Sequence, residues 1–220
     1  MSVGLFDVLG PITVGPSSSH TAGAVRIGQV CRELLGSEVR RAEITFYGSF
    51  AETYRGHGTD KAVVGGLLGF DTFNEQIRDS LTLAPLRGME ISIAVSDALT
   101  PHPNTVHIKA WSRDSEISVS GISIGGGVIR ITEIEGQKVN VSCSSDTLIV
   151  FNRDLAGVVA AVSGLLAGKN INIATLSLCR ARRGTDAIMV IEVDQHIKER
   201  TCEELQALPN VQKVIFLPKL

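Results

Sequence analysis

Serine, threonine and histidine side chains gather in the segment GPSSSHT, residues 15–21, immediately before the first amphipathic helix that the sequence predicts. Hydroxyl groups beside the unpaired N–H groups of a helix start form an anion-binding arrangement suited to a carboxylate or a phosphate. These hydroxyls belong to Ser17, Ser18, Ser19 and Thr21. His20 would feel the positive end of the helix dipole, which favours its neutral, proton-accepting form. The alternative is that the segment only caps the helix.

A second histidine, His57, lies in the segment GHGTDK, residues 56–61. Glycines on both sides of this histidine give flexible backbone, so its ring could be presented to a cleft. Thr59 or Asp60 can cap the helix that follows, and Lys61 adds a cation near the start of that helix. The alternative is a solvated histidine in an exposed loop.

A third histidine, His102, lies in the segment PHPN, residues 101–104, where two prolines stiffen a loop that also carries Asn104. Rigid loops on a scaffold often carry functional residues, so both side chains are candidates for a site. His107 and His196 have no comparable surroundings, and we interpret both as structural.

Three consecutive glycines, Gly125 to Gly127, join two strand-like segments. They lack the G-x-G-x-x-G order opening a helix that is typical of dinucleotide binding. The run therefore predicts a turn or a close approach of ligand to backbone. The sequence also has no nucleophile elbow, zinc-protease or P-loop motif.

The pattern of apolar residues predicts an α+β domain over residues 1–146, because helical and strand-like periods alternate there. Apolar residues at three- and four-residue steps after Thr21 predict a helix that ends at Gly36. The other expected elements are a strand over 42–47, a buried helix over 60–68, strands over 89–95 and 105–111, and two strands within 116–134.

The pattern of apolar residues begins a new series of strands and helices after residue 146, which predicts a second domain over residues 147–220. Its order is β-α-β-β-α-β, which packs two helices on one face of a four-stranded antiparallel sheet in the ferredoxin-like arrangement. The expected elements are strand 147–151, helix 155–167, strand 171–178, strand 187–193, helix 199–207 and strand 211–217.

Composition excludes several classes of protein. The formal charge of −2 disfavours nucleic acid and anionic membranes as partners. No apolar run approaches the ~18 to 20 residues that span a bilayer, and the N-terminus lacks a signal-peptide layout, so we expect a cytoplasmic protein. The four cysteines have neither a disulfide pattern nor metal-ligand spacing, so we expect no metal site in this chain; they are Cys31, Cys143, Cys179 and Cys202.

The strings VFNRDLAGVVA, residues 150–160, and KNINIATL, residues 169–176, resemble the ACT domain, a small amino-acid-sensing module. Gly157 would allow close approach of backbone at a strand-to-helix turn, where helix N–H groups can bind a carboxylate. The polar side chains that can surround the amino group of an effector are Asn152, Asp154 and Asn172. The resemblance implies a ligand between two modules, hence self-association; the alternative is a module that only dimerises.

Four motifs in order resemble the β chain of bacterial iron–sulfur L-serine dehydratases: GPSSSHTAGA, YGSFAETYRGHGTDKAVVGGLLG, PHPNT and SIGGG. This resemblance implies deamination of L-serine to pyruvate and ammonia, in serine catabolism, with a [4Fe-4S] cluster whose cysteines lie on a separate α chain. It implies a hetero-oligomer of the two chains with a shared site. His57 would act as general base or proton shuttle with His20 nearby. The four hydroxyl residues of the first motif would bind the substrate carboxylate, while His102 and Asn104 would orient the substrate.

Two alternatives belong to other functional classes. The first domain also resembles the allosteric substrate-binding domain that precedes the ACT domain in some phosphoglycerate dehydrogenases. A non-catalytic regulatory module would bind a carboxylated or phosphorylated effector at the helix start. The other alternative is a free-standing amino-acid sensor. The sequence has no Rossmann dehydrogenase region, and its histidine-bearing motifs favour catalysis.

Overall fold

The computed structural model describes Val14 and residues 17–220, so Gly15 and Pro16 of the first motif lie outside the described residues. The chain divides into two compact units, Met1–Glu135 and Gly136–Leu220. This division comes earlier than the predicted one after residue 146. The reason is strand β6 (Gln137–Val141), which packs against strands of the second unit.

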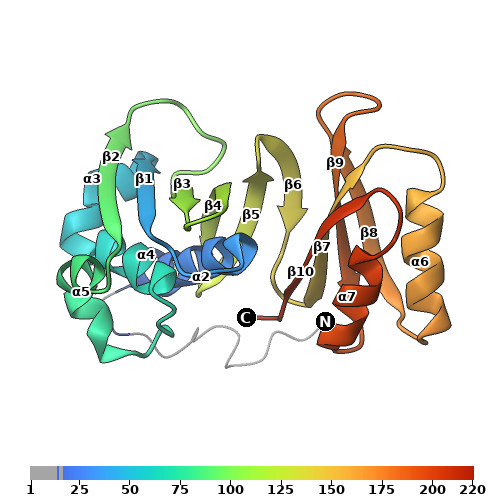
Figure 1. Ribbon diagram of the computed structural model, residues 1–220. Coiled ribbons are helices and arrows are strands. Elements are labelled where there is room, and N and C mark those ends of the chain that lie inside the picture. Colours follow the sequence, from blue (N-terminus) through green and yellow to red (C-terminus); the bar gives the residue numbers. More distant parts are fainter. Residues whose placement is uncertain (1–13, 15–16) are drawn as a thin grey trace, which may run out of the picture. The chain divides into compact units, whose positions relative to one another are not determined.

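Five strands of the first unit lie side by side in the order β2-β1-β3-β4-β5 (Figure 1). Strands β1 and β2 are parallel, and the other neighbours are antiparallel. Gly125 to Gly127 all have positive φ and form the predicted turn between β4 and β5. The strands are β1 (Arg41–Tyr47), β2 (Glu90–Ser96), β3 (Thr105–Trp111), β4 (Glu116–Gly125) and β5 (Val128–Ile134), close to the predicted ranges.

Helix α2 (Gly23–Leu35) is the predicted amphipathic helix, and it ends at Gly36 in the left-handed conformation. A π-helical turn, η1 (Ser18–Ala22), precedes it and carries His20. The apolar stripe of α2 is buried against the sheet: a Cβ atom added at Gly121 of β4 would lie 2.8 Å from Cγ2 of Ile27. The π turn was not predicted, because apolar periodicity does not distinguish it from an α-helical turn.

Helical segments connect the parallel strands β1 and β2, as a parallel pair requires. They are α3 (Gly48–His57), α4 (Thr59–Leu67), the 3₁₀ helix η2 (Glu75–Asp79) and α5 (Ser80–Leu86). Only α4 was predicted. Helix α3 buries one side chain, Phe50, and therefore shows no apolar stripe in the sequence.

Helices α2 and α4 touch through their glycines. A Cβ atom added at Gly66 of α4 would lie 2.1 Å from the carbonyl oxygen of Val25, and one at Gly28 of α2 would lie 2.3 Å from the carbonyl oxygen of Val63. No side chain fits at either position, so the two backbones are in direct contact. This contact fixes α4, and with it the end of α3, relative to the helix that follows His20.

The second unit has the predicted β-α-β-β-α-β order after β6, with strand order β10-β7-β9-β8 and every pair antiparallel. Its core lies on the face of the sheet that carries Leu148, Val150, Met189 and Ile191, where both helices contribute buried residues. The mixed α+β class and the ferredoxin-like C-terminal domain are confirmed. The elements are β7 (Asp146–Arg153), α6 (Val158–Gly168), β8 (Ile173–Arg180), β9 (Asp186–Val193), α7 (Glu199–Gln206) and β10 (Val211–Leu217).

None of the described helices is both long enough and apolar enough to cross a membrane.

Candidate functional site

His20 is held by hydroxyl groups of its own turn. The Oγ of Ser17 caps η1 by accepting a hydrogen bond from the backbone N–H of His20 at 3.2 Å. The Nδ1 atom of His20 lies 3.0 Å from the Oγ of Ser19 and 3.3 Å from the Oγ of Ser17. Two of the four hydroxyls predicted to bind a carboxylate therefore fix the ring of His20 instead.

The other nitrogen of His20 faces helix α3. Its Nε2 atom lies 3.3 Å from the Oγ of Ser49, and the ring meets Phe50 edge-on at 5.2 Å between centroids. Ser49 was not predicted as a site residue, although it belongs to the motif YGSFAET. Gly48 lets α3 start there, with φ of +52°, and an added Cβ would lie 2.7 Å from the carbonyl oxygen of Pro103.

His57 lies against His20, with 4.7 Å between the ring centroids and 54° between the ring planes. The expected loop placement of His57 is wrong, because it is the last residue of α3 and Gly58 ends that helix in the left-handed conformation. Its Nδ1 atom is buried and has no hydrogen-bond partner among the described residues. A buried ring nitrogen without a partner is costly, which marks this pair as a functional candidate.

The pKa of His20 is lowered below 6.5, first by burial and second by the neighbouring charge that His57 can carry. The direction of this pKa shift agrees with the prediction that His20 is neutral. Burial and the second histidine act in the same direction as the helix dipole from which the neutral form was predicted. A neutral imidazole with fixed orientation can accept a proton.

The residues around the start of α4 differ from the prediction. The helix has no side-chain cap: the Oγ1 of Thr59 is buried without a partner among the described residues, and Asp60 accepts from the next N–H group, that of Lys61. Thr21 is buried, and its hydroxyl lies 3.5 Å from the carbonyl oxygen of His57.

His102 and Asn104 stabilise their own loop. The Nδ1 of His102 accepts from the N–H of Asn104 at 3.1 Å, and the Asn104 side chain donates to the carbonyl oxygen of Ser123. No hydrogen bond or ring contact among the described residues joins either of them to His20 or His57. Their loop supports α3 through Pro103, whose carbonyl oxygen accepts from Phe50.

A pocket of about 250 Å³ adjoins the histidine pair. It lies where α3, α4 and η2 meet, and His57 and Thr21 form part of its wall. Its charged lining residues are Arg55, Lys61 and Arg78. None of these three was predicted as a site residue, because isolated basic residues carry no sequence signal that separates them from a solvated surface.

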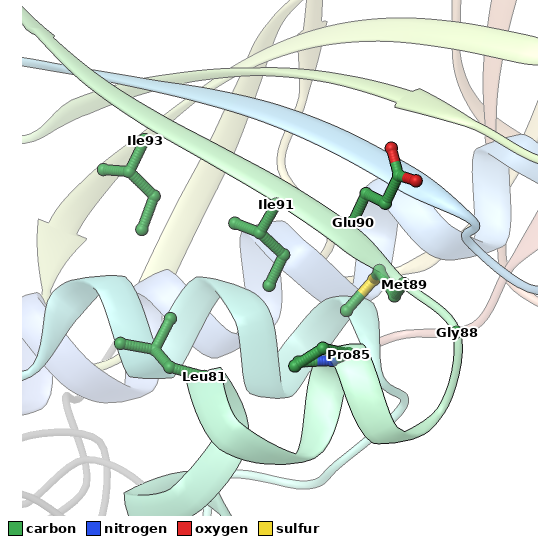
Figure 2. Close-up of a pocket in the computed structure, with 7 residues that line it drawn as sticks. All are labelled: Leu81, Pro85, Gly88, Met89, Glu90, Ile91 and Ile93. Carbon is green, nitrogen blue, oxygen red and sulfur yellow. The ribbon is translucent and has the colours of Figure 1, made fainter.

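A larger pocket lies between α5 and the edge strand β2. Figure 2 shows Leu81 and Pro85 of α5 facing Ile91 and Ile93 of β2, while the carboxylate of Glu90 points away from the helix. The facing side chains are apolar and carry no group that could transfer a proton. The histidine pair is therefore the better candidate for chemistry.

The predicted effector residues of the second unit do not surround one point. Asn152 is buried at the end of β7, and nearby Asp154 accepts from the N–H of Gly184 and from Arg180, which in that order lower the pKa of its carboxyl group. Asn172 lies at the other end of the sheet, where it donates to the carboxylate of Asp194. The strand register shows that the two asparagines are far apart. Asn152 pairs with Ala187 near the start of β9, whereas Ile173, which follows Asn172, pairs with Val193 at the end of β9.

The predicted approach of a carboxylate to the backbone at Gly157 stays a prediction. Its φ is +93°, it caps α6, and an added Cβ would meet no atom within 4 Å. The left-handed conformation is what requires a glycine there.

The two histidines interpreted as structural each contact side chains of their own unit. His107 lies between the hydroxyls of Ser120 and Ser118, and His196 pairs with Asp146 at 3.0 Å.

Two family models match the chain: serine dehydratase beta chain over residues 4–86, and the ACT domain over residues 147–210. A probable L-serine dehydratase beta chain of Bacillus subtilis is 47% identical over 210 residues, which are 96% of each chain. The L-serine dehydratase beta chain of Peptoniphilus asaccharolyticus is 36% identical over 196 residues, 88% of each chain.

More distant similarity extends to D-3-phosphoglycerate dehydrogenase of Bacillus subtilis, which is 27% identical over 200 residues, 89% of this chain and 38% of that protein. The weaker and partial match does not favour the regulatory alternative. Identity near one half along almost the whole length is decisive, and the chain belongs to the serine dehydratase β-chain family, with an ACT domain following the β-chain domain.

Proposed function

We propose that this chain is the β subunit of an L-serine dehydratase and that His20 and His57 carry the proton transfer of the deamination of L-serine to pyruvate and ammonia. The observation that supports this most is the contact of the two imidazole rings at 4.7 Å, together with the lowered pKa of His20. A histidine with a perturbed pKa that contacts a second histidine beside a pocket is typical of acid–base sites.

The reaction needs a base because the α-proton of serine is weakly acidic. The proton passes from Cα to a neutral imidazole of the pair. The Cβ–O bond breaks with its electron pair on oxygen, and that oxygen takes a proton to leave as water. The remaining enamine becomes an imine when its β-carbon takes up a proton, and hydrolysis of the imine releases pyruvate and ammonia.

Ser17, Ser19 and Ser49 are positioning residues for this base. Their hydroxyls contact both ring nitrogens of His20 and hold its orientation during proton transfer. Of the residues predicted to bind the substrate carboxylate, Ser18 and Thr21 keep that proposed role. Thr21 is the better placed of the two, because it lines the pocket beside His57.

The proposed [4Fe-4S] cluster is assigned to the α chain. No group of three His, Cys, Asp or Glu side chains within the described part of this chain could hold a metal ion. Cys31 and Cys143 are buried, and burial raises the pKa of the Cys31 thiol far above its usual range, so that it stays protonated. These residues do not fit an iron–sulfur cluster, and the proposed part of this chain is confined to binding, orientation and proton transfer.

The ACT domain is the proposed site of an amino-acid effector. Asn152 and Asp154 lie at one end of its sheet and Asn172 at the other, so one chain alone cannot surround the ligand with all three. A second copy would supply the missing asparagine, which supports a proposed self-association through this domain.

Reconstitution tests the shared site. We expect that anaerobic mixing of this chain with the α chain gives serine turnover, measured as pyruvate formed, and that neither chain turns over serine alone. Turnover by this chain by itself would contradict the assignment of the cluster to the α chain.

The pH profile tests the neutral state of His20. We expect the activity of the complex to fall on the acidic side with a midpoint below 6.5, because His20 must be neutral and its pKa lies below that value. The variant His57→Gln removes the neighbouring charge and should move the acid limb of the residual activity to higher pH. An acid limb that stays in place or moves to lower pH would exclude His20 as the titrating base.

The lowered pKa of His20 also affects the free energy of unfolding. Folded His20 binds its proton less strongly than unfolded His20, so the free energy of unfolding should fall as the pH drops below 6.5 toward the lowered pKa.

A further inference from the structure

We infer that Arg55, Lys61 and Arg78 form the pocket that binds the carboxylate of the substrate, next to the histidine pair. This inference rests on the proposed function. It adds basic side chains of three other elements, α3, α4 and η2, to the carboxylate binding proposed for Ser18 and Thr21.

The pocket has the size and place that a small acid requires. Its volume is about 250 Å³, and its wall includes His57, Thr21 and the turn between α3 and α4. His57 is also one partner of the ring contact with His20. A carboxylate bound in this pocket would therefore lie next to the pair that takes the proton from the adjacent carbon.

The charge of the pocket is positive and little compensated. Its described lining holds three cations and no carboxylate. Arg78 pairs with Glu75 at 3.1 Å, but both side chains are about two-thirds exposed, so solvent screens that pair. Arg55 stacks over the ring of Tyr54, and neither it nor Lys61 forms an ion pair with a described residue. A pocket lined by one sign of charge concentrates the opposite ion.

Ser17 and Ser19 of the first motif are less suited to this task in the observed arrangement. The Oγ atoms of Ser17 and Ser19 lie 3.1 Å apart, and both contact Nδ1 of His20. A carboxylate bound there would have to displace these contacts and release the ring that must stay oriented. Arginine binds a carboxylate through two parallel hydrogen bonds without any such loss.

The ligand class follows from these features: a small carboxylic acid with a proton to lose at the carbon next to its carboxylate. The carboxylate could belong to the substrate or to a separate effector acid. We commit to the substrate, because the pocket and the histidine pair share His57.

Steady-state kinetics of the reconstituted complex test the inference. In Lys61→Ala and Arg55→Ala we expect the KM for L-serine to rise about tenfold, the effect of one charge-assisted hydrogen bond, while kcat changes less than about twofold. Lys61→Arg keeps the charge and should restore most of the KM. Arg113→Ala is the matched control, because Arg113 is exposed between β3 and β4 and lines no pocket with the other three.

Binding to the full chain without its partner gives a second readout. We expect sodium pyruvate to shift the NMR signals of the His57 ring in the wild-type chain and in Arg113→Ala, and to need about tenfold higher concentration in Lys61→Ala. Each variant is first checked for a wild-type circular dichroism spectrum. This titration tests the pocket even if the complex shows no serine turnover, which would instead count against the proposed function.

Two results would overturn the inference. One is an unchanged KM for L-serine in both alanine variants. The other is pyruvate binding that depends on Lys61 but does not compete with serine, since this would make the pocket an effector site.

Discussion

Replacing His20 by alanine is expected to lower the kcat of the reconstituted complex by about a thousandfold, within the range of general acid–base catalysis. The substitution removes a ring whose two nitrogens are both held by hydroxyl groups, at 3.0 Å from Ser19 and 3.3 Å from Ser49. It also removes the ring that contacts His57 at 4.7 Å between centroids. The measurement is the initial rate of pyruvate formation at saturating L-serine.

His107→Ala is the matched control for this prediction. His107 also lies between two serine hydroxyls, at 3.0 Å and 3.4 Å, but it is on strand β3 and is not part of the pair. Its replacement should leave kcat within about twofold, because His107 contacts neither the histidine pair nor the pocket beside it. Activity of the His20 variant above a tenth of wild type would remove His20 from the proton transfer.

The two histidines should behave as one unit. If both take part in a single proton transfer, replacing His57 in the His20→Ala background should cost far less than replacing it in the wild-type chain. If the loss of rate in the double variant equals the product of the losses in the two single variants, the two histidines have independent roles.

Replacing Gly66 by alanine is expected to destabilise the first unit by about 3 kcal/mol. The new Cβ would lie 2.1 Å from the carbonyl oxygen of Val25 and 2.8 Å from the N–H nitrogen of Gln29, and backbone atoms cannot turn aside as a flexible side chain can. Helices α2 and α4 must therefore move apart. Urea unfolding followed by the fluorescence of Trp111, the single tryptophan, reports on this unit.

Gly56→Ala is the control for the helix packing. Gly56 lies inside α3 with no atom within 4 Å of an added Cβ, so alanine should leave the urea midpoint unchanged or raise it slightly. A Gly66→Ala variant as stable as wild type would show that the direct contact of the two helix backbones is not needed.

The regular helices and strands were largely predictable because their apolar residues recur at clear, regular spacings. Helix α2 buries residues at three- and four-residue steps, and β7 and β9 combine buried residues with clear turn signals at their ends. Helix α3 shows the limit of this reasoning. It buries only Phe50, and its place is set by contacts with Pro103 and with His20 that no local pattern contains.

The site was predictable in its histidines and not in its geometry. His20 and His57 are both in recognisable motifs, but their ring contact depends on how α3 and α4 pack against the helix that follows His20. Ser49 was considered only as part of a motif. Lys61 was considered only as a cation near the start of its own helix. Their roles depend on neighbours that are far away in the sequence, so the sequence alone does not reveal them.

The effector residues of the ACT domain illustrate the role of register. Asn152 and Asn172 flank the same helix, α6, in the sequence, which made a common site plausible. The strands they adjoin, β7 and β8, run in the same direction on either side of β9. The end of β7 and the start of β8 are therefore at opposite ends of the sheet.

The π turn before α2 lets one continuous helical segment serve two purposes with different angular requirements. A π turn holds more residues than an α turn, so it changes the rotational phase of the residues before it relative to those after it. Ser17, Ser19 and His20 take their directions from the wide turn, whereas the core side chains of α2 take theirs from the regular helix. The direction of the imidazole is therefore set by the turn and its hydroxyl contacts, while the core side chains of α2 set how that helix packs.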